Sequence, residues 1–170
     1  MGKGASYERQ MCRKLSLWLS HGEHEDLLWR SSISGGRATV ALKAGRKLSR
    51  QAGDISAIAP LGHILTDRFF LELKHYRNLQ LEAFFLHGKG KLAKFWKKAL
   101  AEAKQHKREP LMIVRQNRTA DLVITKPGAL RDVVHLGKSM SIQVRNSKVT
   151  ACEIRLLQDV LGNLCLLAQG

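Results

Sequence analysis

Apolar positions near the start of the chain follow the period of one face of an α-helix. Within residues 5–21 they recur at the i, i+4, i+7 and i+8 spacing, at Met11, Leu15, Trp18 and Leu19. The pattern predicts an amphipathic helix with Ser6 as its N-cap. Residues 27–36 then form a short apolar run that ends in a Ser/Gly cluster, which predicts a strand followed by a loop over residues 34–52.

Two further apolar segments favour β-strands joined by a short turn. Residues 53–60 place isoleucines beside small alanines and end at a proline. Residues 68–76 are the stronger strand. Phe69, Leu71 and Leu73 alternate there with Phe70, Glu72 and Lys74. We expect a turn near residues 61–66 to bring the two strands together as a hairpin.

The second half of the chain predicts one long helix and two strands before the pattern weakens after Pro127. Residues 89–107 form the helix, with lysines around one apolar stripe made of Leu92, Phe95, Trp96, Ala99 and Ala103. Strands are expected over 110–117 and 120–126, and strands or a short helix over 141–145 and 149–157. The order of helix, three strands, helix and two strands predicts an α/β fold with a mixed central sheet flanked by helices.

Length and charge narrow the functional classes. The 170 residues suit one domain, with a core over residues 5–126 and a C-terminal extension over residues 127–170. Lys and Arg total 29 against 14 Asp and Glu, so the net charge is +15, which indicates a polyanionic partner. Nucleic acid is the first candidate, because neutralised phosphates release condensed counterions. An anionic membrane surface is the alternative, and Gly2 fits the start of a myristoylation site.

Several other classes are disfavoured. No apolar stretch approaches the roughly 18 residues of a transmembrane helix, and the N-terminus lacks the apolar core of a secretory signal. Cys12, Cys152 and Cys165 are odd in number and form no CxxC pair, which argues against a disulfide scaffold and a zinc ribbon. We expect reduced, buried thiols in a cytoplasmic protein that has no membrane attachment and no small-molecule cofactor.

Glu72 and Lys74 carry the first indication of chemistry. Residues two apart in a strand point to the same face, so these two charges lie together on an otherwise apolar strand. Burying either charge without a partner is costly, so they pair with each other, serve a site, or both. Asp54 lies 18 residues before Glu72 (72 − 54), and the expected hairpin brings the two carboxylates close.

Such a group of side chains suits metal-assisted hydrolysis. Two carboxylates held close repel unless a cation lies between them, and hard oxygen ligands suit Mg²⁺. A lysine beside them can position a water, stabilise negative charge or take part in proton transfer, which phosphodiester hydrolysis requires. The competing interpretation is a simple cross-strand salt bridge, since an isolated D…ExK spacing arises by chance in many proteins.

The segments GDI and LELKH resemble the core of the PD-(D/E)xK nuclease superfamily, although Gly53 stands where many members have proline. Within it, the chain most resembles the archaeal-type Holliday junction resolvases, over roughly residues 2–125. The matching segments are GKGASYERQMCRKL with its helical glutamate, the arginine and Ser/Gly loop of WRSSISGG, and the strand with a basic end in PLMIVRQNR.

The resemblance implies a restriction-endonuclease-like fold and a homodimeric, Mg²⁺-dependent DNA endonuclease that cuts branched DNA in recombination, with Mn²⁺ able to substitute. The long basic loop 34–52, the insertion 77–91 and the tail after residue 127 depart from the family and can alter substrate choice. A general nicking or restriction-like nuclease is therefore an alternative, as is a non-catalytic basic DNA-binding protein of the same fold. The small size fits a phage or mobile element.

The resemblance also assigns roles to individual residues. The implied metal ligands are Asp54, Glu72, the backbone carbonyl of Leu73 and Glu8, the last directly or through water. Lys74 is the implied catalytic lysine. Ser34 is the serine expected to reach the scissile phosphate, with Ser31 and Ser32 as alternatives.

Basic residues supply candidate DNA contacts beside this centre. They are Arg30 before the Ser/Gly loop, the loop residues Arg37, Lys43, Arg46, Lys47 and Arg50, and the helix residues Lys91, Lys94 and Lys98. For the helix, a merely solvated charged face is an equal alternative. The apolar segment 81–86 suits either a dimer interface or internal packing. Trp18, Trp29 and Trp96 are expected in the core rather than in base stacking, and His75 is expected to point away from the site.

Overall fold

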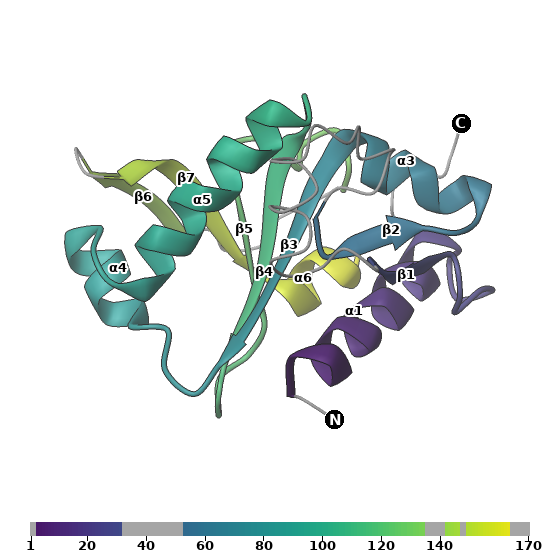
Figure 1. The fold of residues 1–170 in the computed structure, drawn as a ribbon, viewed down its shortest axis with the longest axis horizontal. Coiled ribbons are helices and arrows are strands. Elements are labelled where there is room, and N and C mark those ends of the chain that lie inside the picture. Colours follow the sequence, from purple (N-terminus) through teal and green to yellow (C-terminus); the bar gives the residue numbers. More distant parts are fainter. Residues whose placement is uncertain (1–2, 32–52, 135–141, 147–148, 164–170) are drawn as a thin grey trace, which may run out of the picture.

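A computed structural model of the protein describes residues 3–31, 53–134, 142–146 and 149–163 (Figure 1). Its main feature is a five-stranded sheet in the order β3-β4-β5-β7-β6. The strands are β3 (Phe69–Tyr76), β4 (Glu109–Gln116), β5 (Leu122–Thr125), β6 (Ile142–Asn146) and β7 (Val149–Leu156). Only the β3–β4 pair is parallel, so the sheet is mixed and the predicted α/β class is confirmed.

The segment before β3 folds differently from the predicted hairpin. β1 (Leu28–Arg30) and β2 (Ile55–Ala57) form a separate antiparallel pair. The expected turn is a helix, α3 (Pro60–Arg68), with a proline in its first turn, where the missing N–H costs nothing. A helix between the two strands lets them run in the same direction, and Gly53 forms a parallel bridge with Leu71. The hairpin prediction is therefore wrong, although its consequence, contact between the two segments, holds.

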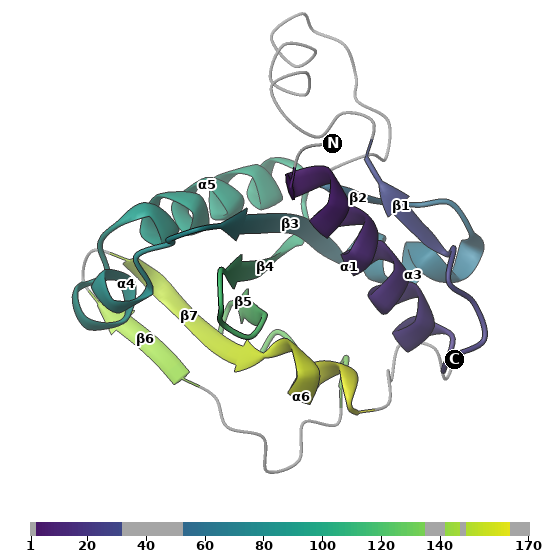
Figure 2. The same cartoon turned by 90° about the horizontal axis from the view of Figure 1, so that it is seen from below.

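Helices cover both faces of the sheet, and β3 runs between α1 (Lys3–Leu19) and α5 (Lys91–Gln105) in both views (Figures 1 and 2). Alternate residues of β4 enter two separate cores. Leu111 and Ile113 join the core under α1, whereas Met112 and Val114 join the core under α5 and α4 (Leu81–His87). The helical stripes predicted for both long helices are thus the surfaces that each one buries.

The C-terminal segment contributes to the same sheet. β7 pairs with β5 and places residues 149–156 between β5 and β6, followed by the short helix α6 (Leu157–Leu161). Of the three tryptophans, Trp18 and Trp96 are buried, but Trp29 is 51% exposed, so its predicted core position is wrong. The physical reason is alternation: Leu28 faces the core, and its neighbour on β1 therefore points outward.

The remaining expectations have mixed outcomes. The Cys12 and Cys152 side chains are buried, as predicted, and neither is in a disulfide, while Cys165 lies outside the described residues. Within α4, Phe84 is fully buried and Leu86 is 65% exposed, so segment 81–86 packs internally on one side only. In the described part of the chain, no helix has the length and apolar character needed to cross a bilayer.

Candidate active site

Strand β3 presents its two sets of side chains to different helices. Phe70 stacks on His106 just after α5 (ring centroids 5.6 Å apart), and Lys74 Nζ lies 5.7 Å from the ring centroid of Phe95 in α5. On the other face, the His75 ring lies 5.1 Å from that of Tyr7 in α1. Alternation therefore turns Glu72 and Lys74 toward α5, and His75 points away from them as expected.

Asp54 is fixed on the free edge of β3. Its backbone N–H donates to Leu71 O at 2.8 Å, and the N–H of Leu73 donates to Asp54 Oδ2 at 2.7 Å. β3 is the first strand of the sheet, so this amide has no strand partner on that side. The carboxylate thus satisfies a sheet-edge donor and is held beside the Glu72–Lys74 pair.

Gly53 is what allows the chain to approach so closely. Its φ is +86°, and a Cβ at this position would lie 2.4 Å from Leu71 O. Proline, which many superfamily members have here, cannot adopt this φ because its ring holds φ near −65°. Glycine in place of the superfamily proline is therefore required by the backbone conformation at residue 53.

The Lys74 ammonium lies among three oxygens. It is 2.5 Å from Glu72 Oε1, 3.1 Å from the carbonyl oxygen of Leu73 and 3.6 Å from Asp54 Oδ2. Burial disfavours the charged amine, but attraction to Asp54 and Glu72 outweighs it, so the pKa of Lys74 is raised. Burial raises the pKa of the Glu72 carboxyl, and repulsion from Asp54 raises it further against the opposing effect of Lys74.

Glu8 on α1 lies near enough to Asp54 and Lys74 to interact with their charges. Its Oε2 accepts a 3.0 Å hydrogen bond from Arg30 Nε on β1. Burial raises the pKa of Glu8, and the negative charge of Asp54 adds to it, while Arg30 opposes the shift. Arg30, predicted to contact DNA, is about two-thirds buried and is engaged with Glu8.

Of the three candidate serines, only Ser31 belongs to the described residues. It is buried, and its backbone N–H donates to Asp54 O at 2.8 Å. Ser32 and Ser34 lie outside the described residues, as do the loop cations Arg37, Lys43, Arg46, Lys47 and Arg50. Which serine reaches a phosphate therefore stays a prediction.

Residues 1–158 match the model of a family described as "Phage putative PDDEXK endonuclease". The chain belongs to this phage PDDEXK family. Membership confirms the superfamily resemblance seen in GDI and LELKH and indicates a nuclease with DNA as its substrate. Comparison with curated proteins and with solved structures found no match.

The PDDEXK site offers oxygen donors that suit a divalent cation. No three Asp, Glu, His or Cys side chains of the described residues form a metal-binding group by themselves. The three oxygens around Lys74 Nζ are two carboxylates and one backbone carbonyl, which are hard donors of the kind that Mg²⁺ prefers. They are also three of the four ligands implied by the superfamily resemblance, the fourth being Glu8. The donor set therefore fits a divalent cation, and in this structure the Lys74 ammonium lies among the same three oxygens.

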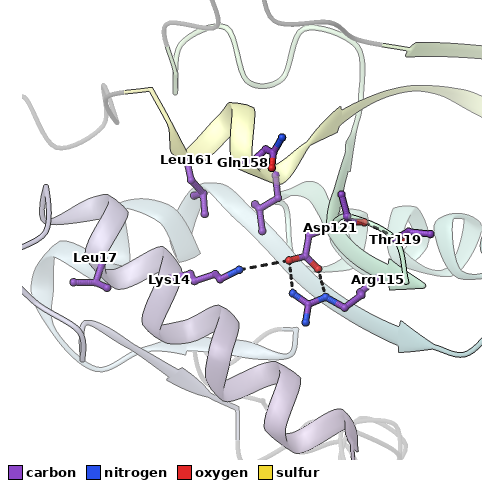
Figure 3. A pocket seen from close by; sticks show the side chains of 9 residues that line it. Lys14, Leu17, Arg115, Thr119, Asp121, Gln158 and Leu161 are labelled. Atoms are coloured by element: carbon purple, nitrogen blue, oxygen red, sulfur yellow. Dashed lines mark hydrogen bonds and ion pairs between the residues drawn. The ribbon is translucent and has the colours of Figure 1, made fainter. Parts of the chain in front are cut away.

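A second polar group lies away from the PDDEXK residues, beside a hollow of about 440 Å³ between α1, α6 and the β4–β5 turn (Figure 3). Asp121 accepts two 2.6 Å hydrogen bonds from Arg115 and one of 3.1 Å from Tyr7, and Lys14 Nζ lies 3.6 Å away. Burial and then Asp121 raise the pKa of the Tyr7 phenol. Through Tyr7 and Lys14, Asp121 connects α1, which carries Glu8, to Arg115 of β4.

Proposed function

We propose that the protein is a Mg²⁺-dependent DNA endonuclease whose centre is Asp54, Glu72 and Lys74. The observation that carries this proposal is the convergence of two buried carboxylates and the Leu73 carbonyl on one positive charge. An ordinary surface salt bridge is a solvent-exposed pair of charges, whereas here three oxygens surround one ammonium that is mostly buried. The family match independently supports nuclease activity.

The residues of the chain have separate tasks in this proposal. Asp54, Glu72 and the Leu73 carbonyl would hold the divalent cation, with Glu8 close to it. When bound, Mg²⁺ supplies neutralisation of the phosphate and a more acidic water, and Mn²⁺ is expected to substitute. Lys74, whose raised pKa keeps it protonated, stabilises negative charge on the phosphate side.

The proposed substrate is branched DNA, with the four-way junction as the first candidate. Support comes from the resemblance of residues 2–125 to archaeal-type resolvases and from the net charge of +15. Resolution of a junction needs two symmetric cuts, so we propose a homodimer. The exposed Leu86 on α4 makes segment 81–86 a candidate for part of that contact. A general nicking enzyme and a non-catalytic DNA-binding protein are the two competing functions.

The test uses labelled substrates of matched sequence: a four-way junction, a flap, a nicked duplex and a linear duplex. Each is incubated with protein in Mg²⁺, Mn²⁺ or EDTA. Asp54→Asn, Glu72→Gln and Lys74→Ala are compared with Glu23→Gln, which removes an exposed carboxylate from the segment after α1. We expect cleavage with either metal, none in EDTA, and loss in the first three variants only.

The outcomes separate the functions. Symmetric nicks in the junction alone support a resolvase, whereas equal cutting of all four substrates supports a general nuclease and rejects the junction assignment. Binding without cleavage in both metals supports the non-catalytic function. Unchanged cleavage by Glu72→Gln and Lys74→Ala would show that these residues are not the centre.

A further inference from the structure

Four side chains form a continuous row that starts at the proposed catalytic lysine. Lys74 Nζ lies 5.7 Å from the ring centroid of Phe95, and the Phe95 ring lies 5.2 Å from that of Tyr76. At the far end, Lys91 Nζ lies 4.9 Å from the Tyr76 ring centroid. Cations and aromatic rings therefore alternate as cation, ring, ring, cation along one surface.

Two rigid elements fix this row. Lys74 and Tyr76 are two residues apart on β3 and share the face that carries Glu72. Lys91 and Phe95 are four residues apart on α5 and share one side of that helix. The positions of the four side chains are thus fixed by a strand and a helix, which hold a binding surface more precisely than loops do.

Burial along the row shows that it opens to solvent. Glu72 is 7% exposed, whereas Tyr76, at the end of the same face, is 38% exposed, and Lys91 is exposed. Phe95 is only partly buried and packs against the core that Leu92 and Trp96 of the same helix help to build. Core packing therefore leaves part of the Phe95 side chain, and more of Tyr76, open to solvent.

We propose that Tyr76 and Phe95 form a stacking platform for an unpaired base of the DNA substrate, with Lys91 contacting an adjacent phosphate. The proposal deepens the nuclease function and rests on it for the position of the scissile phosphate at Lys74. Aromatic rings accept any base face, and a cation over a ring is attracted to it while its remaining donors can bind phosphate.

This platform selects the structure of the DNA. In an intact duplex both faces of each base are already stacked on neighbouring bases, so a protein ring can stack only on a base released from the helix. Such bases occur at a branch point, a flap or a frayed end. The row therefore favours cleavage beside unpaired nucleotides, without reading the sequence.

The experiment places 2-aminopurine, whose fluorescence falls on stacking, at the first unpaired base of a flap. A fully paired duplex of the same sequence is the comparison. Fluorescence and affinity are measured in EDTA, so no cleavage is needed for the signal. The variants are Tyr76→Leu, Tyr76→Phe and Lys91→Ala, and the control is Lys104→Ala, an exposed lysine on the opposite side of α5.

We expect wild-type protein to quench the flap signal. Tyr76→Leu should lose the quenching and bind the flap about 5- to 150-fold more weakly, with duplex affinity unchanged. Tyr76→Phe should restore both properties, and Lys104→Ala should behave as wild type. Lys91→Ala, a surface change, should weaken flap binding even if Tyr76→Leu fails to fold.

Two results would overturn the platform: wild-type protein that leaves the flap signal unchanged, or Tyr76→Leu and Lys91→Ala that each bind flap and duplex as wild type does. Cleavage of the same flap in Mg²⁺ separates this proposal from the nuclease function. Quenching without cleavage retains the platform and rejects the nuclease, whereas cleavage without quenching rejects the platform alone.

Discussion

The backbone amide of Leu73 donates a 2.7 Å hydrogen bond to the Asp54 carboxylate. One amide of the edge strand β3 thus holds a candidate metal ligand. The residues on either side of Leu73, Glu72 and Lys74, point to the opposite face of the strand, toward α5. The relative placement of the three side chains depends on how closely residues 53–54 approach β3. That approach in turn depends on the absence of a side chain at Gly53.

Gly53→Ala should therefore destabilise the protein and impair the site. The new Cβ would lie 2.4 Å from Leu71 O, and alanine at φ +86° is strained in any surroundings. We expect a loss of roughly 2–4 kcal/mol in the free energy of unfolding, since strained backbone of this kind costs about 1–3 kcal/mol before any clash. Urea unfolding measures the loss.

Gly22→Ala is the matched control for this prediction. Gly22 has φ +96°, but nothing lies within 4 Å of a Cβ there, so the variant has the strain without the clash. We expect it to lose only about 1–2 kcal/mol. Equal losses in the two variants would show that the contact with Leu71 is unimportant and that the chain at residue 53 can move away from β3.

Lys74→Met should increase the stabilising effect of a divalent cation. In the metal-free protein the ammonium neutralises Asp54 and Glu72, so its removal leaves two carboxylates in repulsion. A cation that binds the folded state then raises stability by mass action, without competition from the lysine. We expect a lower melting temperature for the variant without metal, and a larger upward shift with Mg²⁺ than in wild type.

Thermal unfolding with and without Mg²⁺, in the absence of DNA, measures both effects. Lys104→Met provides the control, because Lys104 is exposed on the outer side of α5. An identical Mg²⁺ shift in wild type and Lys74→Met would mean that the cation does not bind the oxygens that surround the ammonium.

The centre was predictable because its signals are local. Glu72 and Lys74 stand two apart in a strongly alternating strand, and the apolar stripes of α1 and α5 have a clear helical period. The connection between Asp54 and β3 was not predictable in the same way. The nine residues of α3 contain a proline, a glycine and only three buried positions, so their helical pattern is weak.

Long-range contacts left no sequence signal. Tyr7 and Asp121 are 114 residues apart, and nothing in the short segment around Asp121 indicates that it will receive hydrogen bonds from α1 and β4. The pairing of Tyr76 with Phe95 likewise depends on how α5 crosses β3. Trp29 was misplaced because a strand of three residues is too short to show which of its faces is buried.

Asp121→Ala should destabilise the protein more than the loss of a surface carboxylate does. It removes a buried group that accepts two hydrogen bonds from Arg115 and one from Tyr7. The loss leaves a partly buried guanidinium without its charge partner, and we expect about 2–4 kcal/mol. Urea unfolding of Asp121→Ala and of Glu25→Gln gives the comparison.

Glu25 is the appropriate control because it pairs with Arg13 of α1 through an exposed salt bridge. Exposed pairs contribute little, so Glu25→Gln should be indistinguishable from wild type. Since α1 carries Glu8, Asp121→Ala should also lower nuclease activity under conditions where it remains folded. Full activity and full stability would reject the role of this network in holding α1.

The stability of the protein should fall at alkaline pH partly through Cys12. Burial raises the pKa of its thiol to about 12, with the charge of Glu8 adding to the shift, against an ordinary value of 9.0. Below pH 9 the thiol is protonated in both states. Above it the unfolded chain loses the proton while the folded chain keeps it, so stability falls as pH rises toward 12, by about 1.4 kcal/mol per pH unit for this group.

Cys12→Ala isolates that contribution. Urea unfolding at pH 7.5 and at pH 10.5 should show a smaller alkaline loss in the variant than in wild type, even though the smaller side chain lowers its stability at both values. Tyr7 also has a raised pKa, so some loss should persist above pH 10 in the variant. Equal losses of stability between pH 7.5 and pH 10.5 in the two proteins would mean that the Cys12 thiolate is tolerated inside the fold.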